Sequence, residues 1–143
     1  MVVLSDPIGN YKLTLGTLIR AKVTATNSMG ESIASAANSI GVSVQTIAQT
    51  PSTGPIRVED QSTTSSITVK MTEVIDFSPS AGGAEITSYN LEYNNGAGTT
   101  FVEVVGLTIE QLETEVTVST TPGSTYIFRY RVKNIFGFSG YSP

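Results

Sequence analysis

The chain has 143 residues, a formal net charge of −4, only 14% charged residues, and neither cysteine nor histidine. The acidic balance argues against a nucleic-acid partner, because a phosphate backbone requires a basic surface. The missing cysteines exclude disulfides and thiolate metal sites, and the missing histidines remove the commonest general base and metal ligand. No apolar run approaches the roughly 20 residues of a membrane-spanning helix. The low charge content and the 13 glycines favour an all-β protein, for which we expect no cofactor.

The first part of the chain, residues 1–46, predicts strands at its C-terminal end. Residues 13–30 read LTLGTLIRAKVTATNSMG, and Ile40, Val42 and Val44 then alternate with small or polar residues. Alternation with a period of two predicts a strand, here the closing strand of a sheet. Residues 47–55 contain two prolines and predict a short, semi-rigid linker.

Residues 56–119 carry five further strand signals, at 56–60, 66–72, 86–93, 100–105 and 115–119. Residues 77–83 predict a turn, and Asn94-Asn95-Gly96 predicts a hairpin turn because Asn and Gly tolerate positive φ. The side chains that we expect to point inward are Ile67, Val69, Met71, Tyr89, Leu91, Tyr93, Val116 and Val118.

The clearest strand follows Pro122-Gly123. Tyr126, Phe128, Tyr130 and Val132 alternate with Ile127, Arg129, Arg131 and Lys133, and residues 134–137 then turn the chain out of the strand. We expect the second set to form a solvated outer face, on which Glu92 of the neighbouring strand pairs with Arg129 or Arg131 as an exposed ion pair.

This strand region has an earlier copy. Residues 13–30 align with residues 120–137 without a gap, 107 positions apart, and the same amino acid stands in both copies at Gly16 and Gly123, at Asn27 and Asn134, and at Gly30 and Gly137. A fixed period close to the size of a domain indicates a tandem array.

The pattern Pro-Gly-x-x-Tyr-x-Phe-Arg-x-x-Val-x-Asn-x-x-Gly, from Pro122 to Gly137, resembles the E–F corner, strand F and F–G turn of fibronectin type III domains. The resemblance implies a seven-stranded β-sandwich of about 100 residues. It makes Tyr126 the corner tyrosine, whose hydroxyl bonds back to the backbone, and it places Met71 where the family carries a core tryptophan. We expect Tyr126, Phe128, Met71 and Tyr89 to have structural roles.

The resulting expectation is a fibronectin III- or immunoglobulin-like sandwich with an unusual frame. Residues 56–143 form one nearly complete domain that lacks its last strand, and residues 1–46 form the C-terminal strands of a preceding domain. Either the sequence is a piece of a longer array, or separate subunits complete one another by inserting strands.

The sequence therefore predicts a non-enzymatic repeat unit of an extracellular or cell-surface rod or filament, whose partners are neighbouring domains or copies of itself. The alternative is an accessory binding or adhesion module that recognises protein or carbohydrate. The interface candidates are Ile135, Phe136, Phe138, Tyr141, Ile40, Val42 and Val44, because the apolar loop and the strand edge are hard to cover within one domain.

Two kinds of surface site also follow from composition. The acidic run of Glu110, Glu113 and Glu115 lacks the spaced Asp and Asn ligands of a calcium loop, so a solvated acidic surface is the default expectation. The hydroxyl-rich segments offer candidate O-glycosylation sites, namely Thr50, Ser52, Thr53, Ser62, Thr63 and Thr64.

Overall fold

The computed structural model describes residues 15–96 and 100–143 and is all-β. Its strands are β1 (Thr26–Asn27), β2 (Gly30–Glu31), β3 (Ile56–Arg57), β4 (Ser66–Lys70), β5 (Ile86–Asn94), β6 (Val102–Val105), β7 (Glu115–Ser119), β8 (Ile127–Asn134) and β9 (Gly137–Phe138). Over these ranges the one helical element is the 3₁₀ turn η1 (Glu59–Gln61). No helix in the described part of the chain is long and apolar enough to cross a membrane.

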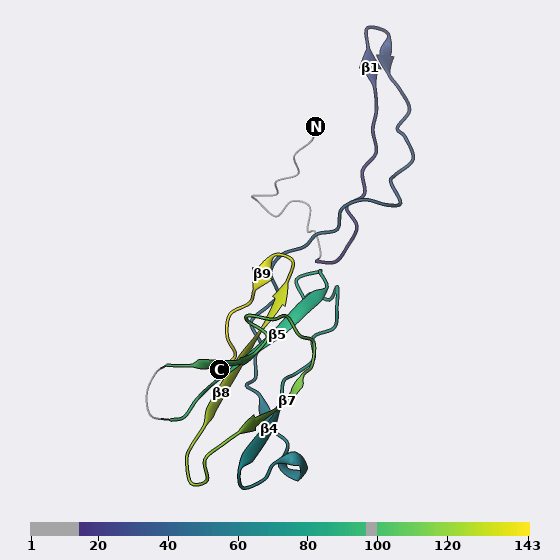
Figure 1. Cartoon of the computed structure of the whole chain (residues 1–143). Helices are drawn as coiled ribbons and strands as arrows, with labels where there is room; N and C mark the ends of the chain where they lie inside the picture. The colour runs from purple at the N-terminus through teal and green to yellow at the C-terminus, as the bar shows by residue number, and fades with distance from the viewer. Residues whose placement is uncertain (1–14, 97–99) are drawn as a thin grey trace.

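The strands from β3 onward form two antiparallel sheets that pack into a sandwich (Figure 1). One sheet has the order β3-β4-β7 and the other has the order β6-β5-β8-β9. The expected all-β sandwich is confirmed. The predicted strands 66–72, 86–93, 100–105 and 115–119 correspond to β4, β5, β6 and β7, which differ from the predictions only by one or two residues at their ends.

The core lies between the two sheets and is built from the side chains that alternate inward. Met71, Leu91 and Val132 are fully buried, Tyr130 is 1% exposed, and Tyr89 is 3% exposed. Burial of side chains of this size contributes about 1.5–3 kcal/mol each. The polar end of Tyr89 is satisfied, because its hydroxyl accepts a hydrogen bond of 2.7 Å from the backbone amide of Val74.

The predicted strand 56–60 is correct only at its start. After Arg57 the chain turns into η1, because the hydroxyl of Ser62 donates to the carbonyl of Val58 at 2.7 Å and accepts the amide of Thr68 at 3.1 Å. A side chain that bonds the backbone in this way competes with the sheet ladder. The sequence pattern of apolar alternation contains no trace of this contact.

The corner before β8 has the contact that the fibronectin resemblance implies. The hydroxyl of Tyr126 accepts a hydrogen bond of 2.9 Å from the backbone amide of Thr121. The ring of Tyr126 also lies 5.8 Å from the ring of Tyr93 on β5, in a tilted arrangement. The tyrosine therefore connects the turn to the neighbouring strand.

The fold contains two similar hairpins, one outside the sandwich and one within it. The first, which we call the N-terminal hairpin, comprises residues 17–44, includes β1 and β2, and extends away from the sandwich (Figure 1). The second, which we call the C-terminal hairpin, comprises residues 127–142. In it, β8 pairs with β9 and residues 139–142 continue alongside β8.

Candidate functional site

The outer face of β8 is covered by aromatic rings. The guanidinium carbon of Arg129 lies 3.8 Å from the ring centre of Tyr141. The guanidinium carbon of Arg131 lies 4.4 Å from the same ring on its other side. The stack alternates cation and ring, and we call it the ladder; its members in order are Phe101, Arg129, Tyr141, Arg131, Phe138 and Lys133. The expected solvated face of β8 is therefore wrong.

The ladder forms because cations spaced two residues apart on β8 meet aromatic residues spaced three residues apart on the segment that runs back beside it. Its cations occur at every second residue of β8, which places them on one face of the strand. Phe138 and Tyr141 are three residues apart, on the segment that runs back along β8 after the turn. Each stacked pair contributes about 0.5–2 kcal/mol, depending on how far it is removed from water.

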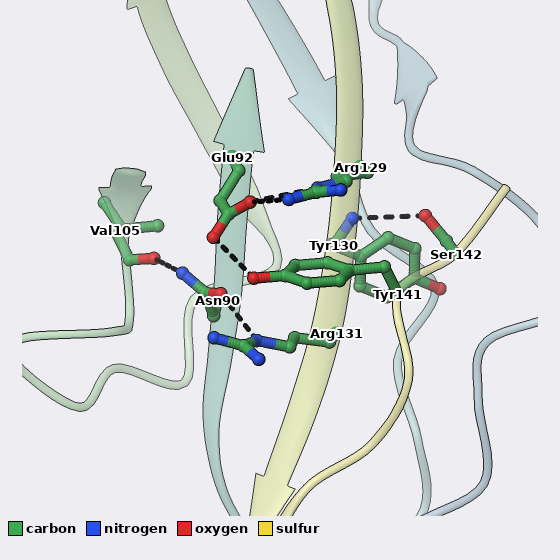
Figure 2. Close-up of polar contacts among 8 residues, drawn as sticks. All are labelled: Asn90, Glu92, Val105, Arg129, Tyr130, Arg131, Tyr141 and Ser142. Carbon is green, nitrogen blue, oxygen red and sulfur yellow. Dashed lines mark hydrogen bonds and ion pairs between the residues drawn. The ribbon is translucent and has the colours of Figure 1, made fainter. Parts of the chain in front are cut away.

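A buried carboxylate anchors one end of the ladder. Glu92 lies opposite Arg129 in the β5–β8 register, and its side chain is 9% exposed. One carboxylate oxygen accepts two hydrogen bonds from Arg129, at 2.9 and 2.7 Å, and the other accepts the hydroxyl of Tyr141 at 2.5 Å (Figure 2). The predicted pairing of Glu92 with Arg129 is confirmed, but the carboxylate is buried and the guanidinium is half-buried, so the pair is not an exposed one.

The other two cations also have polar partners. The side-chain oxygen of Asn90 accepts from Nε of Arg131 at 2.9 Å, while its nitrogen donates to the carbonyl of Val105 at 2.9 Å (Figure 2). Lys133 and Glu110 form an ion pair of 2.6 Å. Glu110, which sequence reasoning placed in an acidic run, thus belongs to the polar border of the ladder.

The environment of Tyr141 changes its acidity. Burial raises the pKa of Tyr141 above its usual value of 10.0, and the hydrogen bond to Glu92 raises this pKa further because ionisation would place two negative charges together. Tyr141 therefore stays neutral, and keeps donating to Glu92, to higher pH than a free tyrosine.

Serine side chains hold the ladder segment in register with β8. The hydroxyls of Ser139 and Ser142 accept the amides of Val132 and Tyr130, each at 3.1 Å. The amides of the same serines donate to the carbonyls of Val132 and Tyr130, each at 2.8 Å. At the turn, Asn134 accepts the amide of Phe136 at 2.9 Å through its side-chain oxygen. Ser139 and Ser142, three residues apart on this segment, thus each bond both the amide and the carbonyl of the residue opposite on β8.

The N-terminal hairpin repeats these bonds 107 positions earlier. The hydroxyls of Ser32 and Ser35 accept the amides of Ala25 and Val23 at 3.0 Å, and their own amides donate to the carbonyls of the same residues at 2.8 and 2.9 Å. At its turn, Asn27 accepts the amide of Met29 at 2.9 Å. The sequence repeat is therefore a repeat of backbone geometry.

The N-terminal hairpin lacks the ladder and the cover of the C-terminal hairpin. The positions of Arg129, Arg131 and Lys133 are occupied by Lys22, Thr24 and Thr26, and those of Phe138 and Tyr141 by Glu31 and Ala34. Tyr130 is 1% exposed, whereas its counterpart Val23 is 71% exposed. The two hairpins share their backbone hydrogen bonds, but they differ in the side chains that lie over each face.

The two regions meet at a junction built on close backbone approaches. Gly16 has a φ of 81°, and a Cβ atom on it would lie 2.5 Å from the carbonyl oxygen of Phe77. Gly83 lies against Gly16 and the carbonyl of Val44 so closely that a side chain there would overlap both. Only glycine allows such contact together with positive φ.

The residues after the N-terminal hairpin are also fixed to the sandwich. The amide of Thr46 donates to the carbonyl of Gly82 at 2.8 Å, and Ala48 is 3% exposed in the core. Asn134 donates to the carbonyls of Thr46 and Ala81 at 2.8 and 2.9 Å. Within the stretch predicted as a linker, Ala48 is therefore packed in the core and Gln49 is bonded to Ser80.

The interface candidates fall into two groups. Phe138 and Tyr141 are partly covered because they stack in the ladder. The other candidates are exposed or half-buried: Ile40 is 84% exposed, Val42 71%, Ile135 70% and Phe136 48%, while Val44 is half-buried at the junction. Their role in an interface stays a prediction.

The O-glycosylation candidates also stay predictions. Thr50, Ser52, Thr53, Thr63 and Thr64 are exposed. Ser62 is half-buried, and its hydroxyl is engaged by Val58 and Thr68. Within residues 15–96 and 100–143, no cluster of three or more acidic side chains could hold a metal ion.

Sequence reasoning missed the ladder, although a signal was present. The run Phe138-Ser139-Gly140-Tyr141-Ser142 places aromatic residues three apart, and the strand before the turn places cations two apart. The two patterns predict stacking only when the turn and the serine bonds bring them together.

Comparison with known proteins yielded no matching family model and no matching curated protein. Among solved structures, domains A168–A170 of titin match 84% of this chain and 36% of theirs, with 24% identity and a TM-score of 0.56. Titin kinase with its flanking domains matches 68% of this chain and 16% of its own, with 26% identity and a TM-score of 0.53. Titin module A71 from human cardiac muscle matches 66% of this chain and 85% of its own, with 28% identity and a TM-score of 0.52.

The chain has an immunoglobulin- or fibronectin III-like β-sandwich fold. It spans about a third of the length of the titin A168–A170 structure. These neighbours are domains or modules of titin.

Proposed function

We propose that this chain is a non-enzymatic structural module, of fibronectin III type, from a tandem array that forms a rod. The observation that carries the proposal is the hydrogen-bond pattern that recurs 107 positions apart, in two separate sheets. A repeat at this spacing is what successive units of one array would produce. The titin neighbours support the proposal, since domains A168–A170 and module A71 are serial units of titin.

The junction supports a defined angle between successive units. The N-terminal hairpin contacts the loop of residues 77–83 through glycines, and residues 46–49 form backbone hydrogen bonds with that loop. The default expectation for a short link between domains is relative motion, unless the contact is tight. Here the close approaches favour a stiff connection, which a rod needs to transmit force along its axis.

The extracellular location, the O-linked sugars and assembly by strand insertion are further proposals from the sequence. The exposed hydroxyls among the O-glycosylation candidates are accessible to a glycosyltransferase, and one edge of the N-terminal hairpin has no strand beside it within residues 15–96 and 100–143, which leaves room for a partner strand. Intact mass of the protein secreted from a eukaryotic host tests the sugars, because an unmodified mass would contradict them.

Lengthened proteins test the rod directly. Adding one or two further copies of residues 37–143 after Pro143 preserves the 107-residue spacing. Small-angle X-ray scattering should then show a straight particle whose maximum dimension grows by an equal step with each copy. As a matched control, Gly83→Val in every junction should bend or loosen the particle, because the side chain would overlap Gly16 and Val44. Identical flexible scattering from both proteins would contradict a stiff rod, and capture of a protein or carbohydrate ligand by such flexible monomers would favour the accessory binding module.

A further inference from the structure

The two hairpins differ most on one strand edge. β8 is bonded on one edge to β9 and residues 139–142, and on the other to β5, from Asn94 opposite Ile127 to Ile86 opposite Asn134. The corresponding strand of the N-terminal hairpin, residues 20–27, is bonded on one edge to residues 30–38. On its other edge, the part of the chain that the structure describes provides no strand.

The backbone groups on that edge are oriented for pairing. The amides of Ala21, Val23 and Ala25 donate to Asn38, Ser35 and Ser32. Because successive amides of a strand point to opposite edges, those of Lys22, Thr24 and Thr26 point to the open edge. Their counterparts on β8 belong to Arg129, Arg131 and Lys133 and face β5.

The side chains next to this edge are exposed, whereas their counterparts on β8 are buried. Tyr130 and Val132 of β8 are 1% and 0% exposed, while their counterparts Val23 and Ala25 are exposed, Val23 at 71%. Residues in the same backbone geometry thus lie in a core in one case and at the surface in the other. In β8 the cover is supplied by the neighbouring strand β5 and by the β3-β4-β7 sheet packed against this face.

Asn27 provides a second and independent indication. Its counterpart Asn134 uses its side-chain oxygen to accept the amide two residues on, and its side-chain nitrogen to donate to the carbonyls of Thr46 and Ala81. Asn27 makes the first contact with Met29 at 2.9 Å. Among the residues that the structure describes, its side-chain nitrogen has no acceptor.

We propose that residues 20–27 are the acceptor site for an antiparallel β-strand with the chemistry of β5, supplied by the front half of a preceding sandwich unit. This strand carries a carboxylate opposite Lys22, as Glu92 stands opposite Arg129, and apolar side chains on the face shared with Val23 and Ala25. The backbone carbonyl of the segment leading into that unit accepts from Asn27. The inference deepens the proposed array by naming the partner of this edge.

The charge at position 22 determines which partner fits. Pairing of an ammonium group with a carboxylate directly across two strands is favourable, whereas two like charges there are destabilising. A half-sandwich whose strand carries the sequence of β5 would place Glu92 across from Lys22 in the register of the second unit. The front half of this chain's own sandwich is therefore a suitable probe.

The test places an extra copy of residues 47–107 directly before Met1 of the full chain, which preserves the 107-residue spacing. Amide hydrogen exchange is then followed by NMR in the extended and the original protein. We expect the amides of Lys22, Thr24 and Thr26 to exchange at least about 100-fold more slowly in the extended protein, because they become part of a covered sheet. Unchanged exchange of these amides, in a sample whose β8 amides are protected, would overturn the proposal.

Two variants of the extended protein make the test specific. Lys22→Glu should reverse at least about tenfold of the gained protection, because it faces the added Glu92, and Lys22→Arg should retain it. Equal protection in all three proteins would show that the strand does not pair in this register. If the extended protein does not fold, the original chain is titrated with a synthetic peptide of residues 85–95: shifts confined to residues 20–27 support the site, and no shifts there overturn it. A straight rod in scattering together with unprotected amides would reject this site while leaving the proposed array intact.

Discussion

The N-terminal and C-terminal hairpins have the same backbone but different environments. Both turns have a glycine at positive φ, Gly30 at 134° and Gly137 at 122°. In both, serines at matching positions accept amides from the facing strand. Yet one hairpin forms part of a core and the other is exposed over most of its length. The register of each hairpin is therefore set by its own side-chain hydrogen bonds. Packing against the rest of the sandwich adds stability to the hairpin that it covers.

The comparison also separates two roles of a hydrogen bond. In the exposed hairpin, an amide that loses its serine can bond to water, so the net loss is small. In the covered hairpin, the same amide has no alternative partner, and leaving it unsatisfied costs about 1–3 kcal/mol. Equivalent substitutions in the two hairpins should therefore have unequal effects, and each pair below serves as its own control.

The largest difference is expected for the cation at the first ladder position. Arg129→Ala should destabilise the sandwich by about 3 kcal/mol, because Glu92 would remain buried without its guanidinium partner. Lys22→Ala, at the matching position, should cost less than about 0.5 kcal/mol. Denaturant unfolding followed by tyrosine fluorescence measures both values. Equal effects of the two substitutions would show that the ladder does not stabilise the fold.

The next difference concerns the serines. Ser142→Ala should cost about 2 kcal/mol, because the buried amide of Tyr130 loses its acceptor. Ser35→Ala removes the same contact from Val23 and should cost less than about 0.5 kcal/mol, because water replaces the hydroxyl. The midpoint of unfolding in urea gives both. A cost at Ser35 as large as that at Ser142 would mean that the N-terminal hairpin is covered in solution.

A smaller difference is expected at the paired glycines. Gly16 and Gly123 both have a φ of 81°, so alanine at either position carries the same backbone strain of roughly 1–2 kcal/mol. Open space surrounds Gly123, whereas a Cβ on Gly16 would meet the carbonyl of Phe77. Gly16→Ala should therefore also loosen the junction and speed exchange of the Thr46 amide, which Gly123→Ala should leave unchanged. Identical exchange of that amide in the two variants would argue against a tight junction.

The smallest effect is expected from the hydroxyl of Tyr141. Its folded pKa lies above the unfolded value near 10.0, so the folded state holds this proton to higher pH. The associated stability is fully present below about pH 10 and is lost as the pH rises through the folded pKa. Tyr141→Phe should cost about 1 kcal/mol at neutral pH by removing the bond to Glu92, and should show a smaller fall in stability above pH 10 than the natural chain. The same alkaline fall in both proteins would assign it to Tyr89, whose pKa burial also raises.

How much of this could be predicted depended on whether the signal was local. The alternation in residues 126–133 identified β8, and the spacing of Gly30 and Gly137 identified the repeat, because both depend on neighbours in sequence. The 3₁₀ turn at Glu59–Gln61 depends on the hydroxyl of Ser62, which apolar alternation does not register. The ladder depends on a turn that brings Tyr141 between Arg129 and Arg131, and the burial of Ala48 depends on the approach of a distant loop. Contacts of this kind become visible only when the strands are placed in space.

Amide hydrogen exchange in the natural chain tests the central claim most directly. The amides of Tyr130 and Val132 and those of Val23 and Ala25 donate to equivalent serines, at 3.0 or 3.1 Å in all four cases. If cover by the sandwich supplies the stability, the first two should exchange only when the domain unfolds, and the second two should exchange many times faster. Equal protection of the four amides would contradict the account, because it would mean that the exposed hairpin is as stable as the covered one.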